Sequence, residues 1–339
     1  MATRILLTID TELVWRHHAA GLGWEENFSR SYQAAGVGVP YQLRVLKEHG
    51  LKACFFVDPM PALAFGLDPV RRMVEPILAA GQEVQLHLHP FWADLDQAER
   101  QGRPFELTGY RFDEQLDLLR RARDLLVAAG APQPIAFRAG SYAANADTLR
   151  ALAALGLRYD SSHNGTHHPW PSALPLPPTL VSPTPTPEGV TEVPVGQLAE
   201  GDGKLRHLQI CAVSFRELRS ALLEAQRREH PLVTIVSHSF ELASRDGLRP
   251  NDVLRRRFDR LCRFLAQHRA HLPTSWFSDL GEVPLSCAAE PPVGRSRLRL
   301  GRVASQVWVG SRYERPAESL TIATGTTIHG AEAFLRYVL

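Results

Sequence analysis

Cysteine is scarce in this chain of 339 residues. Its four members are far apart and form no Cys-x-x-Cys pair, which argues against a disulfide framework and a thiolate metal centre. No run approaches the ~20 consecutive apolar residues that span a bilayer. The first nine residues enter a strand-like run without the charged start, apolar stretch and cleavage site of a secretory leader. These absences predict a reduced, cytoplasmic protein with no transmembrane segment.

An excess of charge of either sign is also missing. Apolar residues make up 44% of the chain and charged residues 22%, with a formal net charge of +2. Such a composition is ordinary for a soluble globular protein and gives no support for a nucleic-acid partner. No Gly-x-Gly-x-x-Gly or Gly-Lys-Ser/Thr loop follows a strand, which argues against a dinucleotide or P-loop nucleotide site.

Short β-rich segments alternate with longer helical patterns. Strand patterns occupy residues 4–9, 52–57, 83–88, 135–137, 158–159, 191–195, 232–237 and 274–277, and helical patterns occupy residues 40–48, 68–80, 113–129, 145–155, 214–228 and 251–271. Strands separated by helices pair in parallel, and seven or eight such units favour a barrel over an open sheet. We therefore predict an α/β fold, a distorted (β/α)7–8 barrel over residues 1–285, with a small C-terminal extension over residues 286–339.

Two stretches interrupt this alternation. Residues 163–189 contain eight prolines, which prevent regular strand pairing and predict a semi-rigid loop that could shape a substrate cleft. Residues 290–302 form an Arg-rich, proline-containing linker to segments of alternating character at residues 306–309 and 320–323. The sequence predicts no function for this tail.

Polar side chains gather where the predicted strands end. Asp10 and Glu12 end the first strand, and His87 and His89 end the third. In a parallel barrel the reactive groups lie at the C-terminal strand ends, and residues at i and i+2 of a strand share a face. Two carboxylates and two imidazoles in this arrangement are typical of a metal-dependent hydrolase.

Three later strand patterns also end in polar motifs. These are Phe137-Arg138-Ala139-Gly140-Ser141-Tyr142, Asp160-Ser161-Ser162 and Val236-Ser237-His238. In this order, the motifs resemble the polysaccharide deacetylase family, carbohydrate esterase family 4, with its nodulation-type deacetylase domain. The resemblance covers roughly residues 5–280.

The resemblance is carried by particular motifs. Family members begin with Thr-Phe-Asp-Asp or Thr-Phe-Asp-x-Asp/Glu, matched by Thr8-Ile9-Asp10-Thr11-Glu12. They continue with Gly-His-Glu-Ile/Val-x-x-His, matched by Gly81-Gln82-Glu83-Val84-Gln85-Leu86-His87, and then with an Arg motif, an Asp-Ser motif and a Leu-x-His motif. The Leu-His-Leu-His-Pro-Phe-Trp and Phe-Arg-Ala-Gly-Ser-Tyr forms are most similar to the subgroup encoded with lipopolysaccharide and capsule biosynthesis genes.

By this resemblance each motif residue receives a role. Asp10 would be the general base, Arg138 would orient it and keep it ionised, and His238 would be the acid that protonates the leaving amine. Glu12 and His87 would be metal ligands. Zinc is the default metal, although two histidines and a carboxylate also suit Fe, Co or Mn. The turn at Ser141 and Tyr142 could offer a backbone N–H to the oxyanion, and substrate contacts are expected at Asp160, Trp92 and Tyr142.

The chain departs from the family pattern at three positions. The second histidine of the family lies four residues after the first, where this chain has Phe91, so we expect His89 to be the second ligand. Glu12 stands where many members carry Asp. Gly140 replaces a common proline, which leaves the turn before Ser141 less constrained.

The sequence therefore predicts a metal-dependent deacetylase that hydrolyses the N-acetyl or N-formyl amide of a sugar or glycan precursor in surface polysaccharide biosynthesis. One alternative is a catalytically silent carbohydrate-binding module on the same barrel, and another is a hydrolase of a non-sugar amide. Structural roles also stay open for single residues. Asp160 could cap the Ser161-Ser162 turn, and Trp92 and Tyr142 could belong to the core.

Overall fold

The computed structural model describes residues 2–93, 104–281, 289–294 and 296–314. Its strands are β1 (Arg4–Thr11), β2 (Cys54–Val57), β3 (Glu83–Leu88), β4 (Ala136–Ala139), β5 (Tyr159–Asp160), β6 (Thr184–Pro185), β7 (Thr191–Glu192), β8 (Gln197–Ala199), β9 (Leu205–His207) and β10 (Leu232–His238). Its α-helices are α1 (Trp15–Ala19), α2 (Trp24–Ser31), α3 (Val39–His49), α4 (Ala62–Phe65), α5 (Asp68–Ala79), α6 (Phe112–Ala128), α7 (Ala146–Ala154), α8 (Phe215–Arg227), α9 (Asp252–Gln267) and α10 (Ser296–Tyr313). Short 3-10 turns are η1 (Ala34–Gly36), η2 (Pro90–Trp92), η3 (Leu107–Gly109), η4 (Gly140–Tyr142), η5 (Gly165–His167) and η6 (Phe277–Asp279).

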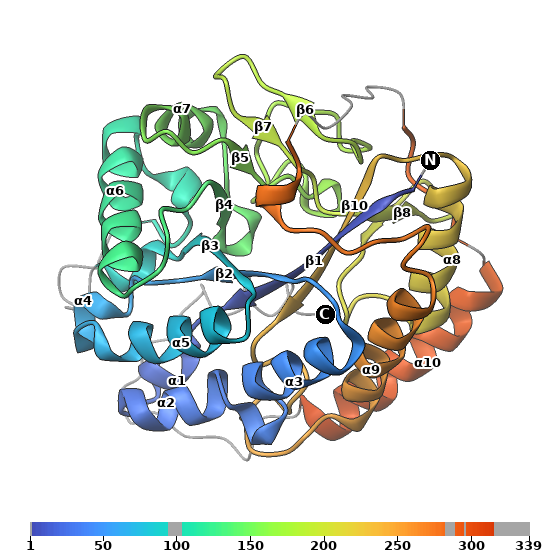
Figure 1. Ribbon diagram of the computed structural model, residues 1–339, viewed down its shortest axis with the longest axis horizontal. Helices are drawn as coiled ribbons and strands as arrows, with labels where there is room; N and C mark the ends of the chain where they lie inside the picture. The colour runs from blue at the N-terminus through green and yellow to red at the C-terminus, as the bar shows by residue number, and fades with distance from the viewer. Residues whose placement is uncertain (1, 94–103, 282–288, 295, 315–339) are drawn as a thin grey trace, which may run out of the picture.

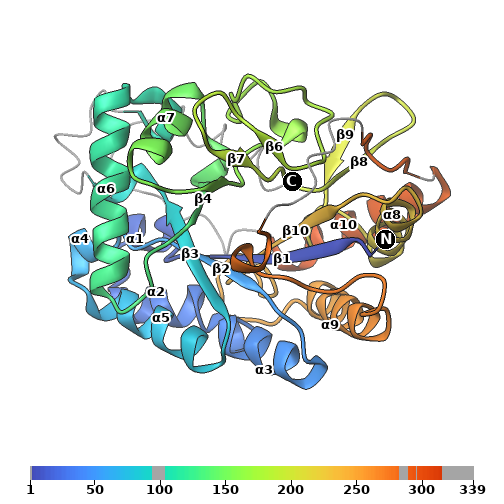
Figure 2. The same cartoon turned by 45° about the horizontal axis from the view of Figure 1, so that its top comes forward.

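The main sheet has eight strands in the order β10-β1-β2-β3-β4-β5-β7-β6. All neighbours pair in parallel except β6, which is antiparallel to β7. The sheet curls, and helices surround it (Figures 1 and 2). Beyond β7, the N–H of Gly196 donates to the carbonyl of Thr234 in β10 at 2.9 Å, which joins the two ends of the curl. The predicted distorted (β/α) barrel is therefore confirmed.

Strand β1 shows how the barrel divides its core. Side chains alternate between the two faces of a strand. Ile5, Leu7 and Ile9 belong to the large cluster that includes apolar residues of the helices. Leu6 belongs to a second cluster with Phe56 and other strand residues. Because Asp10 follows the same alternation as Leu6, its carboxylate lies on the inner face, at the C-terminal end of the barrel.

The strand register brings the motif residues side by side. Asp10 of β1 is paired with His238 of β10 and with Phe56 of β2. His87 of β3 is paired with Arg138 of β4. Residues far apart in the sequence thus meet at one rim of the sheet.

Local sequence signals fix several helix ends. Ser214 caps α8 in a capping box with Glu217, whose side chain accepts from the Ser214 N–H at 2.8 Å. Asn251 accepts from the N–H of Leu254 at the start of α9. Gly50 ends α3 with a φ of 59°, a left-handed conformation that glycine adopts at little cost.

The strand predicted at residues 274–277 is wrong. Thr274 forms an isolated bridge with Ile5 and no longer ladder. This contact is possible because β2 pairs with β1 only from Thr8 onward and leaves the start of β1 open. The chain then turns into η6, where the Glu83 carboxylate accepts from the N–H groups of Phe277 and Ser278 at 2.8 and 2.9 Å. A side chain from β3 thus replaces a strand ladder.

The described part of the C-terminal extension consists of an irregular segment at residues 289–294 and the helix α10. Residues 296–302 of the predicted linker and residues 306–309 lie in α10, so a linker is the wrong description of that stretch. Residues 320–323 lie outside the described residues. Of the described helices, none is both long and apolar enough to cross a membrane.

Candidate metal and catalytic site

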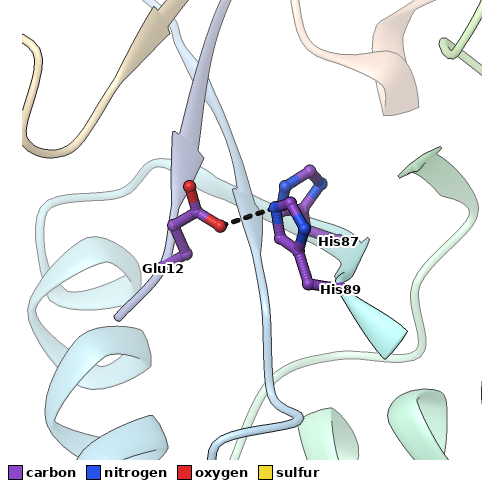
Figure 3. Close-up of side chains that lie close together, drawn as sticks. All are labelled: Glu12, His87 and His89. Atoms are coloured by element: carbon purple, nitrogen blue, oxygen red, sulfur yellow. Dashed lines mark ion pairs between the residues drawn. The ribbon is translucent and has the colours of Figure 1, made fainter. Parts of the chain in front are cut away.

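Glu12, His87 and His89 form a buried cluster at the rim of the barrel. One ligand atom from each lies within 4.8 Å of the others, and the two imidazole rings are 5.1 Å apart. Glu12 directly follows β1. Figure 3 shows its carboxylate directed toward the imidazole rings of His87 and His89 at the end of β3. Two nitrogens and one carboxylate oxygen are a donor set that suits zinc and other divalent transition metals.

His87 is oriented by the main chain of Arg138. Its Nδ1 lies 2.7 Å from the Arg138 carbonyl oxygen, and because a carbonyl only accepts, Nδ1 carries the proton. The lone pair on Nε2 is therefore available to a metal, as in the histidine sites where a second partner fixes the tautomer. Burial lowers the pKa of His87 to about 4, so the ring is neutral at pH 7.

His89 and Glu12 form an ion pair, with Nε2 2.7 Å from Oε2. Burial alone would lower the pKa of His89, but the adjacent Glu12 carboxylate raises it to about 9. Burial would raise the pKa of Glu12, and the charge of His89 lowers it to about 2. The buried Nδ1 of His89 has no hydrogen-bond partner among the residues that the structure describes. A metal ion at the cluster would replace the proton that His89 and Glu12 share.

This proton predicts a pH dependence of metal binding. His89 is protonated below about pH 9 in the metal-free protein, whereas His87 is already neutral above about pH 4. Because ligands must be deprotonated, we expect binding to release about one proton at pH 7 and the apparent affinity for Zn²⁺ to rise ~10-fold per pH unit up to about pH 9. Titration calorimetry in buffers of different ionisation enthalpy measures the released proton.

The stability of the metal-free protein is expected to change with pH in the opposite direction to its metal affinity. The pKa of His89 is raised above its usual 6.5, so the stabilisation from its ion pair is complete below pH 6.5 and disappears as the pH rises through about 9.

A metal affinity independent of pH between 6 and 8 would show that the His89 proton is not displaced.

Gly140 makes room for the His89 ring. A Cβ on residue 140 would lie 2.3 Å from both Nδ1 and Cε1 of His89, a distance that no side chain can occupy. Gly140 and His89 are thus two parts of one arrangement. The ring sits where a side chain at 140 would otherwise be.

We expect Gly140→Ala to displace His89 and weaken Zn²⁺ binding at least ~10-fold, because supporting contacts of a ligand typically affect affinity by that much. A competition titration with a chromogenic chelator measures the affinity. Gly23→Ala is the matched control, since a Cβ there meets nothing within 4 Å. Unchanged affinity in Gly140→Ala would show that His89 is not a ligand.

Asp10 and Arg138 form a buried ion pair beside the cluster. Arg138 Nη1 lies 2.7 Å from Asp10 Oδ1, and the side chains of Arg138 and Asp10 are 0% and 3% exposed, respectively. The guanidinium also donates to Thr8 Oγ1, to the Ser161 carbonyl and to Ser161 Oγ. With so many fixed partners, Arg138 holds one oxygen of Asp10 in place and leaves Oδ2 for other contacts.

His238 faces that second oxygen. Its Nε2 is 3.8 Å from Asp10 Oδ2. On the other side of the ring, Nε2 of Gln209 lies 3.3 Å from Nδ1, and since an amide NH₂ donates, His238 Nδ1 accepts and Nε2 carries the proton. Gln209 is held in turn by Glu241, which accepts at 2.9 Å. This arrangement presents an N–H of His238 toward the cavity.

A cavity of about 170 Å³ joins these groups. Its wall includes Asp10, Glu12, His87, His89, Ser141, Tyr142, His167, Gln209 and His238. Ser141 and Tyr142 have φ values of 54° and 60°, a left-handed conformation that costs non-glycine residues ~1–3 kcal/mol. Such strain commonly occurs at functional turns, and here it places η4 at the cavity wall. His167, from the proline-rich loop of residues 163–189, also lines this cavity.

The structure places two predicted contact residues away from the cavity. Trp92 is fully buried and packs against Trp15, at 5.0 Å between ring centroids, so its position does not support contact with a sugar. Asp160 is also fully buried and accepts from Ser162 Oγ at 2.6 Å. Burial raises the pKa of Asp160, and the structural role left open by the sequence fits its position.

Sequence reasoning missed Asp58, Gln209 and Glu241. Asp58 follows β2 at the same rim as Asp10, so its place at a strand end was a signal that could have been used. It is fully buried, its Oδ2 has no hydrogen-bond partner within the described part of the chain, and burial raises its pKa to about 7. Gln209 and Glu241 lie in irregular segments, and no pattern in the sequence marks them.

No protein-family model matches the sequence, and no curated protein matches it. Among solved structures, a candidate polysaccharide deacetylase from Mycobacterium smegmatis is 19% identical, with a TM-score of 0.50 and 94% of each chain covered. A family 4 carbohydrate esterase from Streptomyces lividans, in complex with acetate, is 16% identical, with a TM-score of 0.41 and 85% of this chain and 98% of that chain covered. A family 4 pseudoenzyme from Bacillus anthracis is 13% identical, with a TM-score of 0.40 and coverage of 82% and 65%. The chain therefore shares the barrel fold of the M. smegmatis protein.

Proposed function

We propose that this protein is a metal-dependent deacetylase acting on the N-acetyl or N-formyl amide of a sugar. The observation that supports this most strongly is that Asp10, fixed by Arg138 and facing His238, shares one cavity with the cluster of Glu12, His87 and His89. A carboxylate base, an imidazole acid and a candidate metal site are groups suited to metal-assisted amide hydrolysis.

In the proposed mechanism Glu12, His87 and His89 hold a divalent cation. When bound, such a cation polarises the amide carbonyl and lowers the pKa of a water molecule to ~7. Asp10 removes a proton from the attacking water, and Arg138 keeps the carboxylate directed at it. His238 then gives its Nε2 proton to the nitrogen of the leaving amine; the ring enters this step as the imidazolium, with the Gln209 carboxamide turned so that its oxygen accepts from Nδ1–H, and leaves it as the neutral imidazole.

The η4 turn is placed to assist the transition state. Ser141 and Tyr142 line the cavity, and a backbone N–H aimed at a developing oxyanion contributes ~3 kcal/mol of stabilisation. The side chain of Tyr142 is packed parallel to His167, with an interplanar angle of 16° and ring centroids 5.8 Å apart. Both residues line the cavity, and an aromatic ring suits the apolar side of a sugar ring.

The substrate that we propose is a sugar unit of a surface polysaccharide precursor, in the cytoplasm. This assignment rests on the resemblance to the lipopolysaccharide and capsule subgroup in the histidine and arginine motifs. A precursor is favoured over a mature wall polymer because the sequence predicts a cytoplasmic location.

The test is a substrate panel on protein reconstituted with Zn²⁺, Co²⁺, Mn²⁺ or Fe²⁺. We expect release of acetate or formate from N-acylated sugars, measured by a coupled acetate assay or by NMR. Small amides and cyclic imides in the same panel distinguish a non-sugar amidohydrolase. Metal bound at one ion per chain, together with no hydrolysis of any member, would contradict the proposal and favour a silent carbohydrate-binding module.

A further inference from the structure

A second cavity lies between α8, α9 and α10, on the side of the barrel away from α6 and α7 (Figure 1). Its volume is about 560 Å³, within the range of small-molecule sites. Its most frequent lining residue is arginine: Arg216, Arg256, Arg257, Arg260, Arg297 and Arg312. We call this cavity the arginine groove.

The positive charge of the arginine groove is not balanced by its own carboxylates. Among the described residues, none of the six arginines forms an ion pair with an acidic side chain. Of the described residues that line the groove, only Asp252 is acidic, and it is bound by Arg255 at 3.0 Å. Six guanidinium groups around one cavity repel one another, so an anion placed among them would be strongly favoured.

Arg257 is the most informative of the six. It is only 5% exposed, and buried arginines are almost always paired with an anion. Here it donates only to neutral groups, which are the Ile210 and Cys211 carbonyls and Ser305 Oγ at 3.3 Å. Burial lowers the pKa of Arg257, and the charges of the nearby Glu241 and Glu217 offset this effect only in part.

Two helices also begin at the groove. Residues Ser214 to Arg216 and Asp252 with Val253 line it, so the first turns of α8 and α9 face the same space. Helix N-termini carry partial positive charge and attract anions. Trp308 of α10, 45% exposed, forms part of the wall and lies against Arg312 at 5.4 Å.

We propose that the arginine groove binds the phosphate or diphosphate group of a soluble small molecule. Guanidinium groups match phosphate oxygens in pairs, which makes arginine the preferred residue for such groups. A compact anion can enter the groove and reach Arg257, whereas a flat anionic surface such as a membrane cannot reach a side chain that is 5% exposed. The exposed indole of Trp308 offers a stacking surface for a ring attached to the phosphate.

The groove adjoins the proposed catalytic cavity. Arg257 donates to the carbonyl of Cys211, and Cys211 itself lines the catalytic cavity. Tyr313 lines the groove and the next residue, Glu314, lines the catalytic cavity. The groove does not depend on the metal cluster, and the inference holds whether or not the chain is a deacetylase.

Binding of inorganic pyrophosphate, followed by titration calorimetry on the full chain, tests the proposal. We expect binding in the micromolar range at low salt, and at least ~10-fold weaker binding by Arg256→Gln/Arg260→Gln, since each charge-assisted hydrogen bond contributes ~1.5–3 kcal/mol. Both replaced side chains are exposed, so the fold is expected to persist. Arg120→Gln/Arg121→Gln on α6 removes the same charge from exposed positions and should bind as the wild type does.

Further arms identify the source of the anion. Uridine diphosphate and inorganic phosphate are titrated in the same way, and Trp308→Phe reports whether a base stacks on the indole. Tighter binding of uridine diphosphate than of pyrophosphate, lost in Trp308→Phe, supports a nucleotide-linked ligand. Equal binding by the groove and control variants would overturn the proposal. So would binding to vesicles containing phosphatidylglycerol, and not to those of pure phosphatidylcholine, without any binding of soluble diphosphates.

Discussion

Replacing Asp10 by asparagine is expected to lower kcat for sugar deacetylation by ~10³-fold, because a general base typically contributes 10²–10⁴-fold. The amide keeps the size of the side chain and can no longer take a proton from water. Metal content should stay at the wild-type value, since Asp10 is not part of the Glu12, His87 and His89 cluster. Initial rates of acetate release at saturating substrate measure the effect.

The same substitution should also reduce stability. Arg138 is fully buried, and Asp10 is its one carboxylate partner at hydrogen-bond distance among the described residues. Removing one partner of a buried ion pair leaves an uncompensated charge and costs ~3–5 kcal/mol. The double variant Asp10→Asn/Arg138→Met removes both charges and should recover part of the free energy of unfolding without recovering activity. Asp10→Asn with wild-type turnover would remove Asp10 from the mechanism.

His87→Ala and His89→Ala are each expected to lose the bound metal almost completely. Elemental analysis by inductively coupled plasma mass spectrometry should find about one ion per chain in the wild type and less than ~0.1 in either variant, because loss of one of three protein ligands removes most of the affinity. His271→Ala is the control, since that histidine is exposed and outside the cluster.

The two histidine variants can also disagree with each other. Metal that is lost in His87→Ala and kept in His89→Ala would show that the second ligand is a different group, and the buried Asp58 beside the cluster would then be the first to test. No metal in the wild type after reconstitution with Zn, Co, Mn or Fe would contradict the site itself.

Strand ends were the part of the molecule that the sequence predicted best. Runs such as residues 232–237 are apolar because they are buried on both faces, and their polar ends fall at the rim that parallel pairing creates. The His-x-His spacing predicted a shared face, and the rings do lie 5.1 Å apart. Local patterns were sufficient where the geometry depended only on the two-residue period of a strand and on the C-terminal edge of the parallel sheet.

Features that depend on packing between distant segments could not be read in this way. Helices α1, α2 and α4 have eight residues or fewer, and helices this short are stabilised by tertiary contacts rather than by their own sequence. Gln209 contacts His238 from an irregular segment. The need for glycine at residue 140 follows only from the position of the His89 ring, which leaves no space for a Cβ. The arginine groove combines residues of three helices, one of them in a tail to which the sequence assigned no role.

Arg138 supports the two halves of the site by different means. Its carbonyl oxygen orients His87, whereas its guanidinium holds Asp10. Mutation can remove the guanidinium, but every residue type supplies a carbonyl. A descendant of this protein that lost the arginine would therefore keep the support for His87 and lose the support for Asp10. If the proposed function holds, loss of hydrolysis with retention of the metal cluster would begin at this one position.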